Sequence, residues 1–349
     1  MANDTAGSVF WQLLLAAQMS ASRSAVWAER FRKNPADALT QLRQGVGLSA
    51  SEINAIRKAP MAELERGLRS GLEVLAFESL PGGARDQGYP AIFAWGRSDA
   101  LYQPMIAIVG TRRASPYGKS VAMKFAEHLT RAGLGIVSGG ALGIDSAAAR
   151  GSMLAGGKTV AVLGTGVDQV YPAANAQLFQ EIRQAGCLVS QFPVGMTSLP
   201  ATFVIRNHLI ASLALGVLVI EAPHDSGALT TARDAIEMNK PVFVVPANID
   251  QSNFWGSHNL IRDGATLVYH PDQLLEMIEW GFLGTESIKA SHLSDLQKQI
   301  LDVLTMEPIP AEKIAEDCGL DVSATLSELT MLELEGSVLR SHSGFSKVL

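Results

Sequence analysis

The sequence has 349 residues, of which 47% are hydrophobic and 18% are charged, and its formal net charge is −6. This length and composition exclude a peptide, a disordered tail and a fibre, and they predict two or three globular domains. No apolar run approaches the ~18 residues of a membrane span, and the apolar stretch 9–19 lacks the basic start of a signal peptide. We therefore expect a cytoplasmic protein with no membrane-spanning segment.

The acidic residues are concentrated at the C-terminal end of the chain. Residues 271–349 contain 5 Lys and Arg against 14 Asp and Glu, which gives this region a net charge of −9. Residues 1–104 and 105–270 instead carry net charges of +1 and +2. Because surface charge has to be judged region by region, the negative total does not exclude an anionic partner for the first 270 residues.

The first hundred residues have a helical pattern. Apolar side chains recur at helical spacing over residues 11–18 and 31–42, which predicts two amphipathic helices. The segment LRQGVGLSASEINAI (42–56) predicts a helix, a tight glycine turn and another helix. It weakly resembles a helix-hairpin-helix, whose turn amides contact phosphate, but a plain packing module has the same pattern. We expect a helical domain over residues 1–80 and a linker over residues 79–100.

From residue 105 onward, short runs of β-branched residues alternate with segments of helix length. The runs are MIAIVG (105–110), LGIVSGG (134–140), TVAVLGTG (159–166), CLVSQF (187–192), GVLVIEA (216–222) and PVFVVPA (241–247). Such strands are typical of a parallel sheet with both faces covered by helices. We predict an α/β domain over residues 81–284, with an extended Rossmann-like, doubly wound and mostly parallel sheet. End signals predict helices over residues 116–132, 145–155 and 227–239.

Residues 285–349 predict a small, acidic, winged-helix-like domain. Ser294 caps a first helix, Pro310 opens a second, Asp321–Glu335 form a third, and residues 337–349 form a short ribbon. A third helix that reads DNA would carry Lys or Arg for phosphates and base edges. This helix carries acidic residues and no Lys or Arg, so we expect the domain to contact protein rather than DNA.

Several catalytic and cofactor motifs are excluded by their spacing. GTRRASPYGKS (110–120) has seven residues between glycines where a P-loop needs four, and GTGVDQ (164–169) lacks the third glycine of a dinucleotide fingerprint. No G-x-S-x-G elbow and no H-x-x-x-H pair occurs, and Cys187 and Cys318 are too far apart in sequence for a metal pair or a disulfide framework. We predict no catalytic residue, no metal site and no cofactor.

The loops that follow the predicted strands are suited to binding anions. Glycine lets backbone amides gather around a phosphate, a helix N-terminus adds partial positive charge, and arginine supplies a fork that matches phosphate oxygens. Phe203 suits either stacking on a base or packing in the core, and Asp145 is interpreted as a helix cap rather than an acid catalyst. The candidate DNA- and phosphate-binding residues are Gly110, Thr111, Arg112, Arg113, Ser138, Gly139, Gly140, Gly143, Gly166, Phe203, Arg206 and Asn207.

These loops belong to a series of longer sequence blocks. In chain order the blocks are AIVGTRRASPYG, SGGALGIDSAA, GGKTVAVLGTGVDQVYPAAN, RNHLIASLALGVLVIEA, SGALTTARDA and GSHNLIRDGA. Over about residues 85–270 they resemble the DprA family (DNA processing protein A, also called Smf). The acidic tail is similar to the winged-helix domain of that family, and relatives often carry a sterile-alpha-motif-like domain where residues 1–80 stand. Relatives often have Lys and Arg where this chain has Ala173 and His208.

The resemblance implies a recombination mediator without catalytic turnover. Such a protein dimerises through its Rossmann-like domain, binds single-stranded DNA and loads RecA onto it during DNA uptake in natural transformation. Two alternatives are a Rossmann-like nucleotide phosphoribohydrolase and a scaffold that contacts only proteins. The phosphoribohydrolase motif P-G-G-x-G-T-x-x-E is not matched, because one extra residue separates Gly140 from Gly143 and alanines occupy the region expected to hold the Glu.

Overall fold

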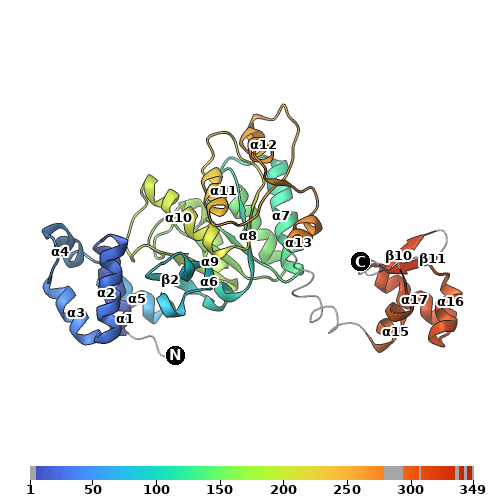
Figure 1. The fold of residues 1–349 in the computed structure, drawn as a ribbon, viewed down its shortest axis with the longest axis horizontal. Coiled ribbons are helices and arrows are strands. Elements are labelled where there is room, and N and C mark those ends of the chain that lie inside the picture. Colours follow the sequence, from blue (N-terminus) through green and yellow to red (C-terminus); the bar gives the residue numbers. More distant parts are fainter. Residues whose placement is uncertain (1–4, 279–293, 306–307, 335–337, 342–343, 348–349) are drawn as a thin grey trace. The chain divides into compact units, whose positions relative to one another are not determined.

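The computed structural model describes residues 5–278, 294–305, 308–334, 338–341 and 344–347. By their internal contacts these residues fall into two units, the first within Met1–Ile278 and the second within Glu279–Leu349. Figure 1 shows the helices and strands of each unit along the chain. Within the described part, no helix is both long enough and apolar enough to cross a lipid bilayer.

In the described chain, nine strands of the first unit form one sheet. The strands are β1 (Leu72–Ala76), β2 (Ala91–Gly96), β3 (Met105–Val109), β4 (Gly135–Ser138), β5 (Thr159–Val162), β6 (Cys187–Ser190), β7 (Gly216–Val219), β8 (Val242–Val244) and β9 (Thr266–Leu267). Their order across the sheet is β1-β2-β6-β5-β4-β3-β7-β8-β9. Strands β3 to β9 pair in parallel, whereas β2 runs antiparallel to β6 and β1 antiparallel to β2. The predicted α/β class with a doubly wound, mostly parallel sheet is confirmed.

The strand order reverses next to β3. From β3 the chain adds β4, β5 and β6 on one side, and it then returns to add β7, β8 and β9 on the other side. In open α/β sheets, ligands bind in the crevice outside the carboxyl ends of the strands at such a reversal. The loops that follow β3 and β7 therefore flank the position where such a fold binds its ligand.

The six predicted strands are observed as β3 to β8, but β1, β2 and β9 were missed. Residues 79–100, expected to be a linker, instead contain α6 (Gly82–Asp86), strand β2 and the start of the 3₁₀ helix η2 (Ser98–Tyr102). The linker prediction was wrong because the glycines and prolines of this segment belong to a short helix, to a buried strand and to the turns beside them. Ile92 and Phe93 at the centre of β2 are fully buried.

Helices cover both faces of the sheet, because alternate residues of each strand point to opposite sides. Val160 and Val162 of β5 share a core with α10 (Pro200–Leu213) and α11 (Ala228–Glu237). Ala161, which lies between them, faces a second core that contains residues of α8 (Ile144–Leu154) and α9 (Ala176–Ala185). Helix α7 (Pro116–Arg131) packs against α8 and lies beside β4. The three predicted helices are thus observed as α7, α8 and α11.

The other helical segments of this unit lie between strands or after β9. They are the 3₁₀ turns η1 (Phe77–Ser79), η3 (Ala173–Asn175) and η4 (Ser252–Phe254) and the helices α12 (Trp255–Arg262) and α13 (Pro271–Met277).

Five helices precede the sheet and share its core. They are α1 (Thr5–Ala16), α2 (Ala21–Lys33), α3 (Pro35–Gln44), α4 (Ala50–Arg57) and α5 (Met61–Arg69). Phe10 and Leu14 of α1 belong to the same core cluster as Phe93 of β2. Buried Gln12 donates to the carbonyl of Val194 and accepts from its amide, both at 3.0 Å. The N-terminal helices are therefore fastened to the sheet, and a domain boundary at residue 80 stays a prediction.

The predicted helix, glycine turn and helix are confirmed as α3, the turn 45–47 and α4. Gly45 ends α3 with a φ of 77°, and Ser49 begins α4 with a reciprocal hydrogen-bond pair to Glu52. The turn amides of Gly45, Val46 and Leu48 all donate to carbonyls within the turn and α3. Because these amides are already used, the geometry favours a packing module over a phosphate-binding hairpin.

The second unit has the predicted winged-helix arrangement. Its elements are α15 (Asp295–Val303), α16 (Ala311–Cys318), α17 (Val322–Leu334) and the antiparallel strands β10 (Val338–Ser341) and β11 (Gly344–Lys347). Ser294 caps α15 by accepting from the amide of Gln297 at 3.1 Å, and Ile300, Ile314 and Leu329 lie in a buried core. The predicted end of the third helix at Glu335 and the predicted boundary at residues 284–285 lie outside the described residues.

Candidate nucleic-acid interface

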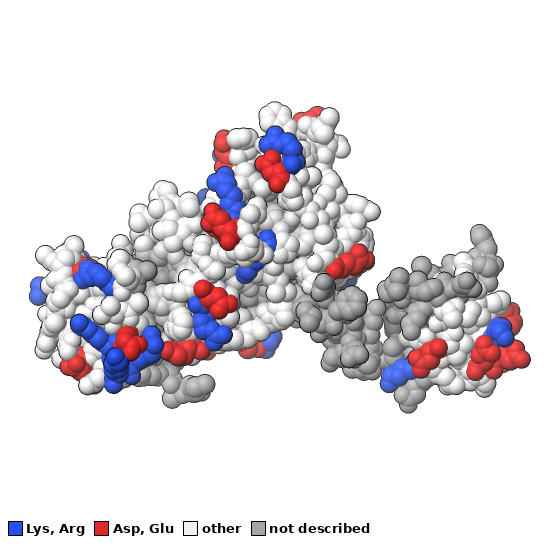
Figure 2. Space-filling model, in the orientation of Figure 1, with Lys and Arg blue, Asp and Glu red and all other residues white. Residues whose placement is uncertain are grey.

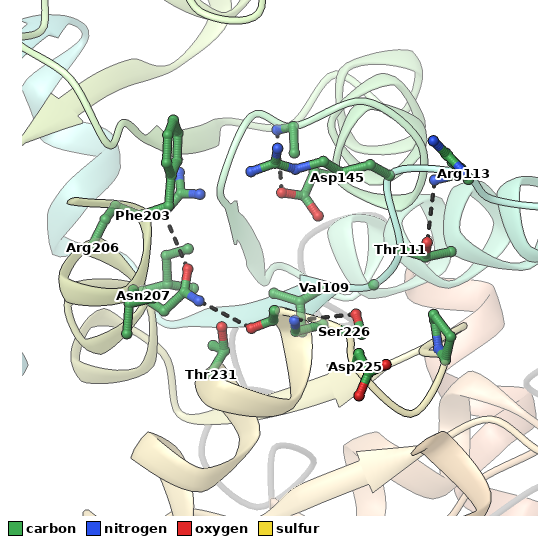
Figure 3. Close-up of a pocket in the computed structure, with 18 residues that line it drawn as sticks. Val109, Thr111, Arg113, Asp145, Phe203, Arg206, Asn207, Asp225, Ser226 and Thr231 are labelled. Carbon is green, nitrogen blue, oxygen red and sulfur yellow. Dashed lines mark hydrogen bonds between the residues drawn. The ribbon is translucent and has the colours of Figure 1, made fainter. Parts of the chain in front are cut away.

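A cavity of about 340 Å³ opens at the carboxyl ends of β3 and β7, where the strand order reverses. Its walls come from the loop after β3, from the first turns of α10 and from the segment 223–231 around the start of α11. Figure 3 shows Phe203 and Asn207 of α10 on one side of this cavity and Thr111 and Arg113 on the other. Segments more than 90 residues apart in sequence therefore meet at one edge of the sheet.

The loop after β3 presents two free cations to the cavity. Arg112 and Arg113 are exposed and line the cavity, and within the described chain neither has an ion-pair partner. Gly110 cannot carry a side chain, because a Cβ would lie 2.5 Å from Ile144 and 2.9 Å from the carbonyl of Glu221. The amide of Arg113 donates to the Thr111 hydroxyl at 3.2 Å. The Thr111 hydroxyl therefore accepts a hydrogen bond from the Arg113 amide, and both guanidinium groups remain available for a ligand.

Glu221 anchors both ends of this loop from the end of β7. The amide of Thr111 donates to the Glu221 carbonyl at 2.7 Å. The fully buried Glu221 carboxylate accepts from the Ser115 amide and hydroxyl, at 3.0 and 2.7 Å, and from Asn253 at 3.1 Å. Ser115 in turn caps α7 by accepting from the amide of Gly118 at 3.0 Å. Because both ends are fixed, Arg112 and Arg113 project from a restrained segment.

The loop after β4 is closed by a carboxylate of the same chain. The amides of Gly139 and Ala141 donate to Asp145 at 3.1 and 3.2 Å, and Ser138, Gly139 and Gly140 are buried. Asp145 is not the helix cap that we expected, since Gly143 occupies that position and Asp145 lies inside the first turn of α8. The amides that suggested a phosphate site are thus already occupied.

Gly143 allows the loop after β4 to approach the loop after β3 closely. It has a φ of 82°, and a Cβ at this position would lie 2.3 Å from the carbonyl of Thr111. The next residue, Ile144, donates its amide to that same carbonyl at 3.3 Å. A glycine is required here because any side chain would collide with the loop that carries the two exposed arginines.

Arg206 is buried beneath the cavity and joins three segments. Its side chain is only 5% exposed and donates to the carbonyls of Gly139 and Val162. Burial lowers the pKa of Arg206 to about 10, although the nearby Asp145 opposes this change. Burial also disfavours the charged form of Asp145 and so raises its pKa, whereas the nearby Arg206 acts to lower it. Through its two hydrogen bonds Arg206 ties α10 to β5 and to the loop after β4, close to the buried Asp145 carboxylate.

Phe203 lies between arginines and a second aromatic ring. The guanidinium carbons of Arg112 and Arg206 lie 5.2 and 5.8 Å from its ring centroid, and the Tyr171 ring lies 5.3 Å away. Such distances are those of cation–π and aromatic pairs. A Cβ on Gly164 would lie 2.6 Å from the Phe203 ring, so this glycine makes room for it. Phe203 therefore contacts the Arg112 guanidinium as well as lining the cavity.

The exposed charges at the cavity are predominantly positive. Arg112 and Arg113 are free, whereas the charge of Asp145 is compensated by its neighbour Arg206. Asp225 is the exposed acid among the cavity residues. The arrangement suits a phosphate at the arginine side of the cavity.

The chain matches known families over most of its length. Residues 84–279 match the family described as "DNA recombination-mediator protein A", and residues 286–344 match the "DprA winged helix domain". The chain belongs to the DNA recombination-mediator protein A family.

Sequence relatives in this family include proteins of Escherichia coli and Streptococcus pneumoniae. The chain is 35% identical over 270 residues to Protein Smf of Escherichia coli (strain K12), and the alignment covers 74% of this chain and 72% of that protein. It is 39% identical over 189 residues to the DNA processing protein DprA of Streptococcus pneumoniae (strain ATCC BAA-255 / R6), covering 54% of this chain and 67% of that protein.

Solved structures of the same family are also similar. DprA from Streptococcus pneumoniae superimposes with a TM-score of 0.64 at 29% identity, covering 76% of this chain and 95% of that chain. DprA from Helicobacter pylori has a TM-score of 0.55 at 30% identity, covering 59% of this chain and 95% of that chain, and its structure is described as giving insight into its single-stranded DNA binding mode. These matches confirm the resemblance to the DprA family.

The structure brings seven of the twelve candidate residues together around the cavity. They are Gly110, Thr111, Arg112, Arg113, Phe203, Arg206 and Asn207. The other five, which are Ser138, Gly139, Gly140, Gly143 and Gly166, do not line it. Gly166 is buried and donates its amide to Met196 at 2.8 Å. Direct contact of these five glycine-loop residues with DNA stays a prediction.

Ala173 and His208, where the family resemblance led us to expect Lys and Arg, lie outside the cavity wall. The ring of His208 makes a hydrogen bond with the Tyr89 hydroxyl at 2.9 Å, and Ala173 is exposed in η3. Neither residue lines the cavity. The loss of a cation at these positions therefore leaves Arg112 and Arg113 unaffected.

Sequence reasoning missed the third wall of the cavity and the anchor of its first loop. The wall residues Ser226 and Thr231 belong to the block SGALTTARDA, which carries the DprA resemblance but has no charged residue at its start to indicate a ligand. The anchoring role of Glu221 had a clearer signal in the sequence. An acidic residue at the end of a buried apolar strand requires several hydrogen-bond donors, which predicts that nearby segments bind to it.

Proposed function

We propose that this chain is a non-enzymatic recombination mediator that binds single-stranded DNA at the β3–β7 cavity and loads RecA onto it, in DNA uptake by natural transformation. The observation that carries the proposal is the pair of free arginines, Arg112 and Arg113, on a loop restrained at both ends beside an aromatic ring. The DprA of Helicobacter pylori, which is 30% identical over the matched region and is described by its single-stranded DNA binding mode, supports the proposal.

The cavity suits an unpaired strand better than a duplex. Guanidinium groups attract the phosphates of either form. A cavity lined by Phe203 and Asn207, however, accepts a base only when that base is turned away from a partner strand. We therefore expect the two arginines to supply affinity and the cavity wall to supply preference for single strands.

We propose that the protein acts as a homodimer through its Rossmann-like domain. Strand β9 is the edge of the sheet, and the exposed apolar side chains of Ile249, Trp255, Leu267 and Tyr269 lie on it or in neighbouring segments. Large apolar groups around an open strand edge are typical of an interface. Two linked copies would bind one strand through two sets of arginines, which raises avidity.

The acidic winged-helix unit is proposed to contact a protein partner such as RecA. Its third helix, α17, has no Lys or Arg and exposes the apolar side chains of Val322, Leu326 and Met331. On the face drawn in Figure 2, acidic side chains cover more of α15 to α17 than basic ones do. Negative charge repels DNA phosphates, so this unit is suited to a protein surface instead.

The function is tested by binding titrations with single- and double-stranded oligonucleotides of one sequence. We expect tighter binding to the single strand and a logarithmic salt slope of about −0.7 for each phosphate neutralised. Light scattering should give the mass of a dimer, and RecA filaments should form faster on single strands coated with a blocking protein when this chain is added. Equal affinity for both forms, or no effect on RecA, would refute the proposal. Incubation with nucleoside monophosphates should release no free base.

Deleting residues 285–349 should leave the affinity for single-stranded DNA within about twofold of that of the full chain. The reason is that the cavity and its anchors lie entirely in the first unit, and the removed unit is acidic. The same titration measures this, and the RecA assay should show reduced loading. A large loss of DNA affinity would contradict the assignment of this unit to protein contacts.

A further inference from the structure

A second aromatic ring, outside the twelve candidate residues, lies beside the cavity. Tyr171 stands in the loop between β5 and η3, and its ring is 5.3 Å from that of Phe203. Tyr171 is 42% exposed, whereas Phe203 is only partly exposed and is engaged by Arg112, Arg206 and Gly164. Of these two rings, Tyr171 is the one with more surface open to a ligand.

Exposed apolar residues lie close in sequence to Tyr171 and to Phe203. Val170 precedes Tyr171, and Leu199, Val204 and Ile205 lie at or near the start of α10, close in sequence to Phe203; all four are about half exposed. We call Tyr171 and these four residues the Tyr171 rim. A rim of this kind next to free arginines combines a surface for flat apolar groups with a site for anions.

We propose that Tyr171 is a stacking surface for an unpaired nucleobase whose neighbouring phosphate is held by Arg112, and that this contact selects single strands over duplexes. The inference rests on the proposed function and assigns a separate task to a residue of the same site. Phe203 bridges the two groups, because it contacts both the Arg112 guanidinium and the Tyr171 ring.

The chemistry explains why this contact would discriminate strands but not sequences. All bases have an aromatic face, so stacking on a tyrosine tolerates any of them. In a duplex those faces are covered by neighbouring base pairs, and only the phosphates remain accessible. Arg112 would then act on both forms of DNA, and Tyr171 on the unpaired form alone.

The test compares a thymine oligonucleotide with an abasic oligonucleotide of the same length, both bound by the full-length protein. We expect Tyr171→Ala and Tyr171→Leu to weaken binding of the thymine strand by about 5- to 10-fold, and to leave binding of the abasic strand unchanged. Tyr171→Phe should retain wild-type affinity, because stacking needs the ring and not the hydroxyl. With a 2-aminopurine strand, wild-type protein should quench the fluorescence, and Tyr171→Leu should restore it.

Two variants separate this inference from the proposed function. Arg112→Ala should weaken binding of both strands, because it removes a phosphate contact. Tyr102→Ala is the matched control, since Tyr102 is 55% exposed but lies in η2 at the amino end of β3, away from the cavity. Its affinity for either strand should not change.

Two outcomes would overturn the inference. The first is an unchanged affinity of Tyr171→Leu for the thymine strand, and the second is an equal loss for thymine and abasic strands. If the first came with reduced RecA loading, it would assign the Tyr171 rim to a protein partner. If wild-type protein binds neither oligonucleotide, the proposed function itself has failed.

Discussion

Replacing Arg112 with alanine is expected to weaken binding to single-stranded DNA by about 10- to 100-fold, the range of a lost hydrogen bond to a charged group. The guanidinium is exposed, lines the cavity and has no ion-pair partner among the described residues. Its loop is held by Thr111 and Ser115 on Glu221. Removing the side chain should therefore cost affinity without loosening the loop. Fluorescence anisotropy at several salt concentrations would measure it, and the slope should become shallower by about 0.7.

Arg150→Ala is the matched control for this substitution. Arg150 is about half exposed on α8, where it lies 3.8 Å from Glu181, and it does not line the cavity. Its loss should change DNA affinity by less than about twofold, because a surface ion pair contributes little. If Arg112→Ala keeps full affinity, or if both variants lose affinity equally, the phosphate site does not lie at the loop after β3.

Replacing Arg206 with methionine is expected to destabilise the fold by about 3–5 kcal/mol. The substitution leaves the Asp145 carboxylate buried without its opposite charge, and it removes the donor to the carbonyls of Gly139 and Val162. Urea unfolding followed by linear extrapolation would measure the loss. DNA affinity at low temperature, where the variant is still folded, should fall less than it does for Arg112→Ala.

The double variant Asp145→Asn with Arg206→Met provides the control for this pair. It removes both charges, so its free energy of unfolding should be higher than that of Arg206→Met alone. A stable Arg206→Met protein that has lost DNA binding would contradict this role and would make Arg206 a direct DNA ligand. The two substitutions thus distinguish the arginine that contacts DNA from the arginine that supports the site.

Much of the fold could be predicted from the sequence because its signals are local. The strands β3 to β8 are short, apolar and β-branched, and serines or glycines mark the ends of their helices. In the second unit, Ser294 and Pro310 begin two helices as expected. Strands β1 and β2 were missed because they lie among glycines and prolines, and their pairing with each other and with β6 depends on residues far away in sequence.

The sequence by itself also determined which loops meet at the edge of the sheet, since the carboxyl ends of parallel strands lie at one edge. Only the tertiary structure decided which groups in those loops are free. The glycine amides after β4 are occupied by Asp145, and Arg206 is buried while Arg112 is exposed. The physical reason is that solvent exposure and hydrogen-bond partners depend on which distant segments cover a residue, and no local pattern specifies that.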